Sequence, residues 1–339
     1  MDITKTRDAT FDLAKAAAMF MVVCSHVIFY RQGFNLVDMP SHLMNFIQVV
    51  NMPLFFMISG YFSRRLHEEG NWSKLLNRVI TYFWPMAIFA VIFKCISSLG
   101  FGEFPASELP IAILKCFLFQ GWFFQALAIC DGITFLACRW HRKWQVTVVC
   151  MVGYAICLVG SGRMWYVGNV VPMIPFYWFG LVLLPVILQS GRMFSLLAYL
   201  GVAALIFVTW FYGNIATNGL AFYWDKFDVL HPEAAKATNM LLRLVVGSFG
   251  ALGILWHVRM AVSKFSYLEK LGCFGEETLG VYFLQGWLIV HFVTPFVGLE
   301  ATAPVLLLAS CGIYLAAFCI VKLLKANELI RKVVFGWRV

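Results

Sequence analysis

Long apolar runs dominate this chain and restrict what it can fold into. A bilayer is spanned by a helix of about 20 apolar residues, and ten runs fit that length. They cover residues 10–30, 43–63, 76–97, 111–137, 145–160, 171–189, 194–212, 238–257, 276–297 and 304–324. Charged residues make up only 13% of the chain, against about 25% in soluble domains. We therefore predict an all-α, polytopic membrane bundle of about ten helices, forming one domain over residues 1–339.

The distribution of basic residues predicts the orientation of the bundle. With the N-terminus placed inside the cell, the interior segments hold 18 Lys and Arg residues and the exterior loops hold four. Cytoplasmic loops are enriched in Lys and Arg, so both termini are expected to be cytoplasmic. The run 111–137 is long and contains Gln120-Gly121, where we expect it to break into two pieces.

Net charge and cysteine usage each exclude a class of function. The net charge of +9 is explained by the basic interior loops, so it does not indicate nucleic-acid binding. The ten cysteines lie almost entirely within apolar runs or beside basic loops. Buried free thiols behave as small hydrophobes, so we predict no disulfide and no metal site.

The first apolar run carries a stripe of ionisable side chains. Lys15 and His26 are separated by 11 residues, which places them about 20° apart around a helix and about 16 Å apart along it. Asp12 lies one turn before Lys15, near the same stripe. Ionisable residues inside a membrane usually mark a functional site, and imidazole exchanges protons near neutral pH. The stripe therefore predicts a polar site with His26 as its general base.

The segment 51–66 ends the second run with Ser59-Gly60 and then Arg64-Arg65. Two interpretations stand for it. Glycine permits close approach of a ligand and arginine binds phosphate; alternatively, small residues pack helices together and arginines anchor the cytoplasmic end. Arg243, inside the outer end of the eighth run, either lines the entrance for an acceptor or snorkels to the interface.

Several segments resemble the signatures of the acyltransferase 3 family. The opening segment DLAKAAAMFMVVCSH resembles the family's Asp, Arg or Lys, and His pattern. MPLFFMISGYFSRR resembles its Ser-Gly-Tyr signature. The matching segments are 12–26, 52–65, 74–85, 121–130 and 275–287.

This resemblance implies an integral membrane O-acyltransferase. Its members usually move acetyl from acetyl-CoA onto sugars of exported glycans, lipids or cell-wall polymers. It implies catalytic roles for His26, Lys15 and Asp12. Donor-phosphate contacts would come from Arg64, Arg65, Arg78 and Lys15, and the candidates for the substrate pocket are Trp122, Tyr282, Arg243 and Ser59.

Two positions depart from the family pattern. Lys15 stands where much of the family has Arg, and Lys cannot form Arg's bidentate contact. Gln285 stands at the late signature's His, which removes a titratable group. A membrane sensor or scaffold that kept the fold without the chemistry therefore stays a weaker alternative.

The sequence thus predicts transfer of acetyl from cytoplasmic acetyl-CoA to a hydroxyl of an exported or lipid-linked glycan, in the bacterial inner membrane. The expected partners are acetyl-CoA, the glycan acceptor and membrane lipids, without nucleic acid or metal. A transporter or flippase is the alternative, because buried Lys, Arg and His also line carriers. The identity of the acceptor and the oligomeric state are left open.

Overall fold

The computed structural model describes most of the chain as helices. The residues it describes are 8–31, 42–69, 71–101, 109–115, 121–140, 171–211, 215–216, 221–222, 232–293, 295 and 302–336. The predicted run 145–160 lies outside these residues. The helical architecture expected from the apolar runs is present in the described part of the chain.

Five helices are long and apolar enough to cross a membrane. They are α1 (Ala9–Arg31), α2 (His42–Glu69), α3 (Trp72–Phe101), α12 (Pro232–Lys264) and α15 (Ala303–Ala326). Shorter apolar helices accompany them, namely α5 (Trp122–Trp140), α10 (Gly191–Phe211) and α14 (Thr278–Phe292). This set of apolar helices is typical of a multi-pass membrane protein.

The remaining elements are short. The run Ile174–Gln189 is built from α8 (Ile174–Trp178), the π-helical turn η4 (Phe179–Leu183) and α9 (Leu184–Gln189), preceded by the 3₁₀ turn η3 (Val171–Met173). The other helical pieces are α4 (Leu109–Lys115), the 3₁₀ segment η5 (Ser266–Leu271), α13 (Gly272–Glu276) and α16 (Glu328–Phe335). A two-residue antiparallel pair, β1 (Ile215–Ala216) and β2 (Ala221–Phe222), is the one departure from helix among the described segments.

The predicted fourth and eighth runs differ in detail from the structure. The fourth divides into α4 and α5, with α5 beginning directly after Gly121, close to the expected break. The eighth extends well beyond 238–257, since α12 begins at Pro232. Proline is favoured at the first position of a helix, a start signal that hydrophobicity alone does not register.

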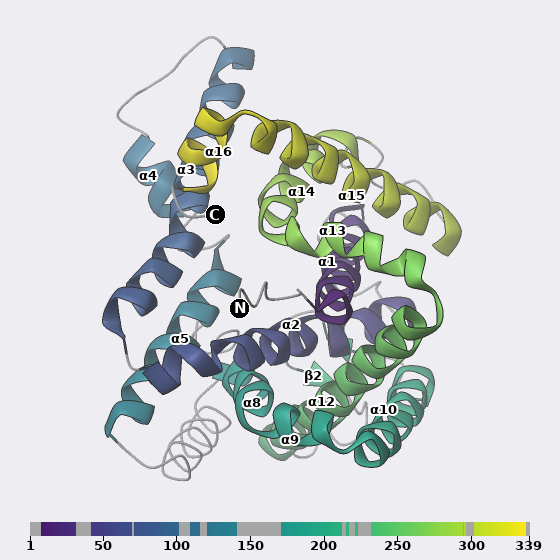
Figure 1. The fold of residues 1–339 in the computed structure, drawn as a ribbon. Helices are drawn as coiled ribbons and strands as arrows, with labels where there is room; N and C mark the ends of the chain where they lie inside the picture. Colours follow the sequence, from purple (N-terminus) through teal and green to yellow (C-terminus); the bar gives the residue numbers. More distant parts are fainter. Residues whose placement is uncertain are drawn as a thin grey trace.

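Helix α1 lies in the middle of the bundle. It contacts α2, α12, α13, α14 and α15, and it is seen nearly end-on among them in Figure 1. Its side chains from Ala9 to Tyr30 are all buried or partly buried. The spans differ in how much of them is buried. In the 18-residue apolar stretch of each span, 72% of α2 is buried inside the protein, against 22% of α3. α1 and α2 are therefore the inner helices, and α3 faces outward.

A tight crossing joins α2 to the α8–η4 segment. A Cβ on Gly60 would lie 1.9 Å from the Tyr177 carbonyl oxygen, and one on Gly180 would lie 1.8 Å from that of Met57. Both positions therefore require glycine, because the two backbones touch there. Of the two interpretations of Ser59-Gly60, helix packing accounts for the glycine.

Candidate active site

The three residues of the predicted stripe on α1, Asp12, Lys15 and His26, lie at two different depths along the helix. The Lys15 ammonium pairs with the Asp12 carboxylate at 2.7 Å, and it also lies 5.5 Å from the centre of the Phe62 ring. Phe11 stacks on Tyr61 of α2 with ring centres 4.7 Å apart. The first two family-like segments are thus in contact. His26 is three turns farther along, about 16 Å away, beyond the reach of the Lys15 side chain.

His26 faces α14. It is partly buried, and its flanking residues Ser25 and Val27 are buried. Its ring interacts with the side-chain amide of Gln285, which is only 2% exposed. The Gln285 Oε1 atom is fully buried yet makes no hydrogen bond of ordinary geometry with the described residues. His26 thus interacts with Gln285, the position at which this chain departs from the family's late signature.

Aromatic rings fill the space between α5 and α14 near this pair. Tyr282, one turn before Gln285, lies 5.5 Å from Phe123 and 4.9 Å from Phe124 between ring centres. Phe124 also stacks on Phe283 at 5.0 Å. Trp122 begins α5 and meets Phe123 edge-on at 6.3 Å. The predicted pocket residues Trp122 and Tyr282 are therefore parts of one aromatic wall.

Arg78 belongs to a buried polar network around Asp131. Its Nε lies 2.8 Å from Asp131 Oδ2 and donates to the Tyr82 hydroxyl at 2.6 Å. Tyr82 donates to Asp131 Oδ2 and Ser63 to Oδ1, each at 3.1 Å, and Tyr177 also donates to Oδ1. Asp131 is fully buried. This network ties together α2, α3, α5 and α8.

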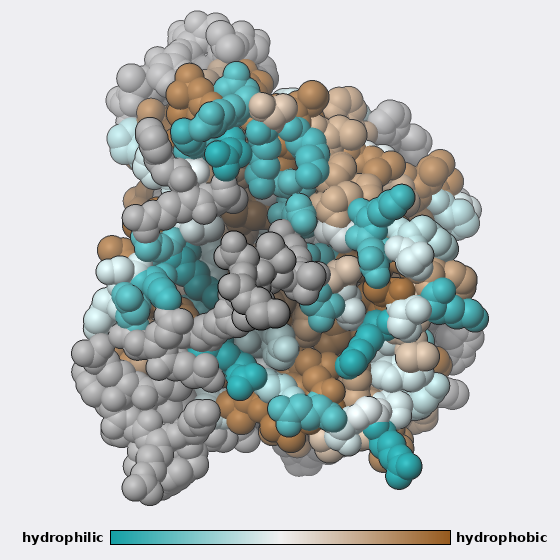
Figure 2. Space-filling model, in the orientation of Figure 1, coloured by the Kyte–Doolittle hydropathy of each residue, from teal (hydrophilic) through white to brown (hydrophobic). Residues whose placement is uncertain are grey.

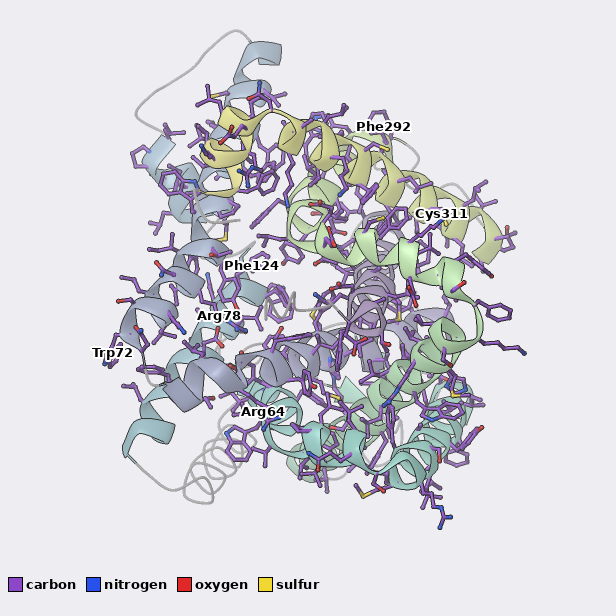
Figure 3. All side chains as sticks on the ribbon, in the orientation of Figure 1. Arg64, Trp72, Arg78, Phe124, Phe292 and Cys311 are labelled. Atoms are coloured by element: carbon purple, nitrogen blue, oxygen red, sulfur yellow. The ribbon has the colours of Figure 1, made fainter. Side chains whose placement is uncertain are left out.

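Phe124 lies between this network and the α14 side of the bundle. It stacks on Tyr82 with ring centres 6.1 Å apart, and it contacts Tyr282 on α14. Figure 3 shows Phe124 and Arg78 in the same region, while Arg64 lies on the other side of α2 in that view. Arg64 and Arg78, two of the three arginines predicted to bind donor phosphate, therefore have different surroundings (Figure 3).

Two of the other predicted residues, Ser59 and Arg243, form contacts between helices. Ser59 contributes its carbonyl, which accepts from Ser63 Oγ at 2.7 Å and from Arg78 Nη2 at 3.4 Å. Arg243 is 6% exposed, and its Nη2 donates to the Gln48 carbonyl at 3.3 Å, which joins α12 to α2. Arg64 is partly buried. The Arg65 side chain lies outside the described residues.

One face of the molecule is strongly polar. Figure 2 shows hydrophilic residues gathered on the face where the α1 N-terminus and α16 lie, and this face is hollowed between the α3–α5 side and the α1–α14 side. Glu277, just before α14, pairs with Lys322 at 3.0 Å and with Lys325 at 2.8 Å. Burial raises the pKa of Glu277, but its bonds to Lys325 and Lys322 outweigh burial and leave the pKa below its ordinary value.

Sequence reasoning missed Asp131 and the role of Glu277. Asp131 is a lone carboxylate inside the predicted run 111–137, and an ionisable residue at that depth is itself a signal. Glu277 could be suspected from Lys322 and Lys325, which lie near the end of the last apolar run. Their partners are distant in sequence, so only the fold shows which charges meet.

Comparison with known proteins identifies the family. Residues 8–323 match the family model described as an acyltransferase domain. Comparison with curated proteins and with solved structures gave no match. The matched stretch includes the α1 stripe, the α2 crossing and the α14 segment with Gln285, which are the segments that carry the resemblance. The chain therefore belongs to the acyltransferase 3 family and is an acyltransferase.

Proposed function

We propose that this acyltransferase is an O-acetyltransferase that uses acetyl-CoA from the cytoplasm and acetylates a hydroxyl of an exported or lipid-linked glycan. The bacterial inner membrane is its proposed location. The observation that supports this most is the position of His26, on an inner helix and beside a buried amide. A base that is held inside the bundle can meet a donor from one side and an acceptor from the other.

The chemistry needs one proton carrier. A hydroxyl is a weak nucleophile until a base removes its proton. The acceptor hydroxyl gives its proton to His26 while its oxygen attacks the thioester carbonyl. The carbon–sulfur bond then breaks, and the CoA thiolate takes the proton back from His26. The base is restored, and no covalent enzyme intermediate is required.

Donor binding is assigned to the polar face. Arg64 and Arg65 lie near the C-terminal end of α2, on the side predicted to be cytoplasmic, and Lys15 pairs with Asp12 near the start of α1. Guanidinium groups bind phosphate oxygens bidentately. Arg78 is a weaker candidate than the sequence suggested, because its guanidinium is already bound by the buried Asp131 carboxylate. We assign Arg78 to the architecture of the site and Arg64 and Arg65 to the donor.

The test compares two histidines in membrane vesicles given labelled acetyl-CoA. His26→Ala should lower CoA-thiol release and glycan labelling by about 10²–10⁴-fold, the usual contribution of a general base. His257→Ala is the matched control, because its Nδ1 is bound within α12 to the Gly253 carbonyl at 2.7 Å. Equal transfer by a folded His26→Ala protein would eliminate the proposal. A transporter would release no CoA from either protein.

A further inference from the structure

The chain between α12 and α13 carries large apolar side chains on the molecular surface. It consists of Phe265 and the six residues of η5, none of which is buried. Phe265 is 42% exposed, Tyr267 is 62% exposed and Leu271 is 39% exposed. The ring centres of Phe265 and Tyr267 lie 5.8 Å apart. This connecting segment, residues 265–271, therefore presents an apolar surface to its surroundings.

The connecting segment begins where a candidate membrane span ends. The apolar stretch Arg243–Lys264 of α12 is long enough to cross a bilayer. Phe265 leaves the helical conformation at φ −127° and ψ 91°, so the chain turns directly after the span. A Cβ on Gly272, the residue after η5, would lie 3.6 Å from Asp12 Cβ near the start of α1. Both helix ends belong to the side that the distribution of Lys and Arg predicts to be cytoplasmic, so the segment lies at the headgroup level of that leaflet.

Basic side chains flank the exposed apolar ones. The Lys264 ammonium lies 5.4 Å from the centre of the Phe265 ring, and both Lys270 and Arg259 are exposed. From residue 259 to residue 271 the sequence holds three basic residues and a single acid, Glu269. The surface around the connecting segment therefore carries an excess of positive charge, which is complementary to anionic lipid headgroups.

Apolar side chains next to cations suit the interface between a membrane and water. Tyrosine is enriched at the headgroup level, and anionic lipids of the cytoplasmic leaflet attract Lys and Arg beside a span. We propose that residues 265–271 bind anionic lipid headgroups, with Phe265, Tyr267 and Leu271 entering the headgroup region. Lys264 and Lys270 contact the lipid phosphates. Figure 1 shows the link between α12 and α13 at the outer edge of the bundle, where lipid reaches it.

The first measurement uses the full-length wild-type protein in two kinds of lipid nanodisc. One contains phosphatidylcholine alone, and the other contains equal parts of phosphatidylcholine and phosphatidylglycerol. We expect amide hydrogen exchange of residues 265–271 to be at least about fivefold slower with phosphatidylglycerol, the effect of one basic residue near an anionic surface. The difference should disappear at about 1 M NaCl, where the Debye length is about 3 Å. Equal exchange in the two lipid mixtures would overturn the proposal.

Paired variants test whether the cations beside the segment are responsible. Lys264→Gln combined with Lys270→Gln should remove the dependence of exchange on phosphatidylglycerol. Arg331→Gln combined with Lys332→Gln removes two cations from α16 and is the matched control, which should keep that dependence. Equal loss in both double variants would mean that only the overall charge of the protein matters, and it would refute a local binding site.

The apolar contribution is tested by Tyr267→Ser combined with Leu271→Ser. Both side chains are exposed, so we expect the fold to persist. Exchange of residues 265–271 should become faster in both lipid mixtures, because apolar insertion does not require anionic lipid. Unchanged exchange, or protection that arises only when two copies share a nanodisc, would contradict lipid binding. None of these measurements uses acetyl transfer, so their outcome is independent of the proposed function.

Discussion

Two polar clusters inside this bundle differ in how completely they are hydrogen-bonded. Around Asp131 each carboxylate oxygen has at least two partners, drawn from Arg78, Tyr82, Tyr177 and Ser63. At His26 the neighbouring Gln285 oxygen is buried without an ordinary hydrogen bond. Both oxygens of Asp131 therefore have partners, whereas the Gln285 Oε1 atom can still accept a hydrogen bond.

This difference separates architecture from chemistry. A fully bonded buried network fixes how helices meet, because removing one member leaves the others uncompensated. An incompletely bonded group can still bind a substrate or exchange a proton. We therefore assign the Asp131 network to holding α2, α3, α5 and α8 together, and His26 to the proposed reaction. The variants below test that assignment through the free energy of unfolding.

The largest expected loss of stability is at Asp131. Asp131→Asn keeps the shape but leaves the partly buried Arg78 cation without its counter-ion, which should cost about 3–5 kcal/mol in the free energy of unfolding. Reversible unfolding in mixed micelles would measure it. The matched control is Glu328→Gln, which breaks the exposed pair with Lys332 and should cost less than about 1 kcal/mol. Similar losses for both variants would mean that the Asp131 network is not the anchor.

The next largest effect is at the α2 crossing. Gly60→Ala brings a Cβ to 1.9 Å from the Tyr177 carbonyl oxygen, so α8 must move and Tyr177 with it. Overpacking of this kind costs about 1–3 kcal/mol or more, measured by the same unfolding experiment. Gly286→Ala has nothing within 4 Å of the added Cβ, and it should be neutral or slightly stabilising. A tolerated Gly60→Ala would contradict the close crossing.

The smallest effect concerns Glu277, a buried carboxylate just before α14 that pairs with Lys322 and Lys325. Its pKa is depressed by Lys325 and Lys322 despite its burial. A depressed carboxylate pKa gives stability that is present above the unfolded pKa and is lost as pH falls through the folded pKa. As pH is lowered below about 4.5, the wild-type thermal midpoint should therefore fall further than that of Glu277→Gln. Parallel pH curves for the two proteins would show that the cluster contributes no stability.

Much of this arrangement follows from the sequence because its causes are local. Apolar length predicts the long helices, and Gln120-Gly121 predicts the interruption before α5. The shared stripe of Lys15 and His26 stays a prediction. The causes that sequence reading misses are long-range. Arg78 and Asp131 are distant in the chain, and so are His26 and Gln285. No local pattern indicates which helices meet.

Some details depend on contacts that local rules do not describe. The π-helical turn η4 includes Gly180, whose backbone touches that of Met57. Pro185, two residues after η4, has no N–H to donate. Helix propensity predicts an ordinary helix there. Likewise, phosphate chemistry suggested a donor role for Arg78, whereas the fold gives it a carboxylate partner. A cationic residue's role is thus decided by its neighbours.

The central claim is that His26 is the base and that it serves the chemical step rather than donor binding or folding. The most direct test is a single-turnover measurement of acetyl transfer at saturating acetyl-CoA, with the dissociation constant of the donor determined on the same preparation. For His26→Ala we predict a rate constant lower by at least about 100-fold with donor affinity within threefold of wild type. An unchanged rate constant, or a loss explained wholly by weaker donor binding, would contradict the account.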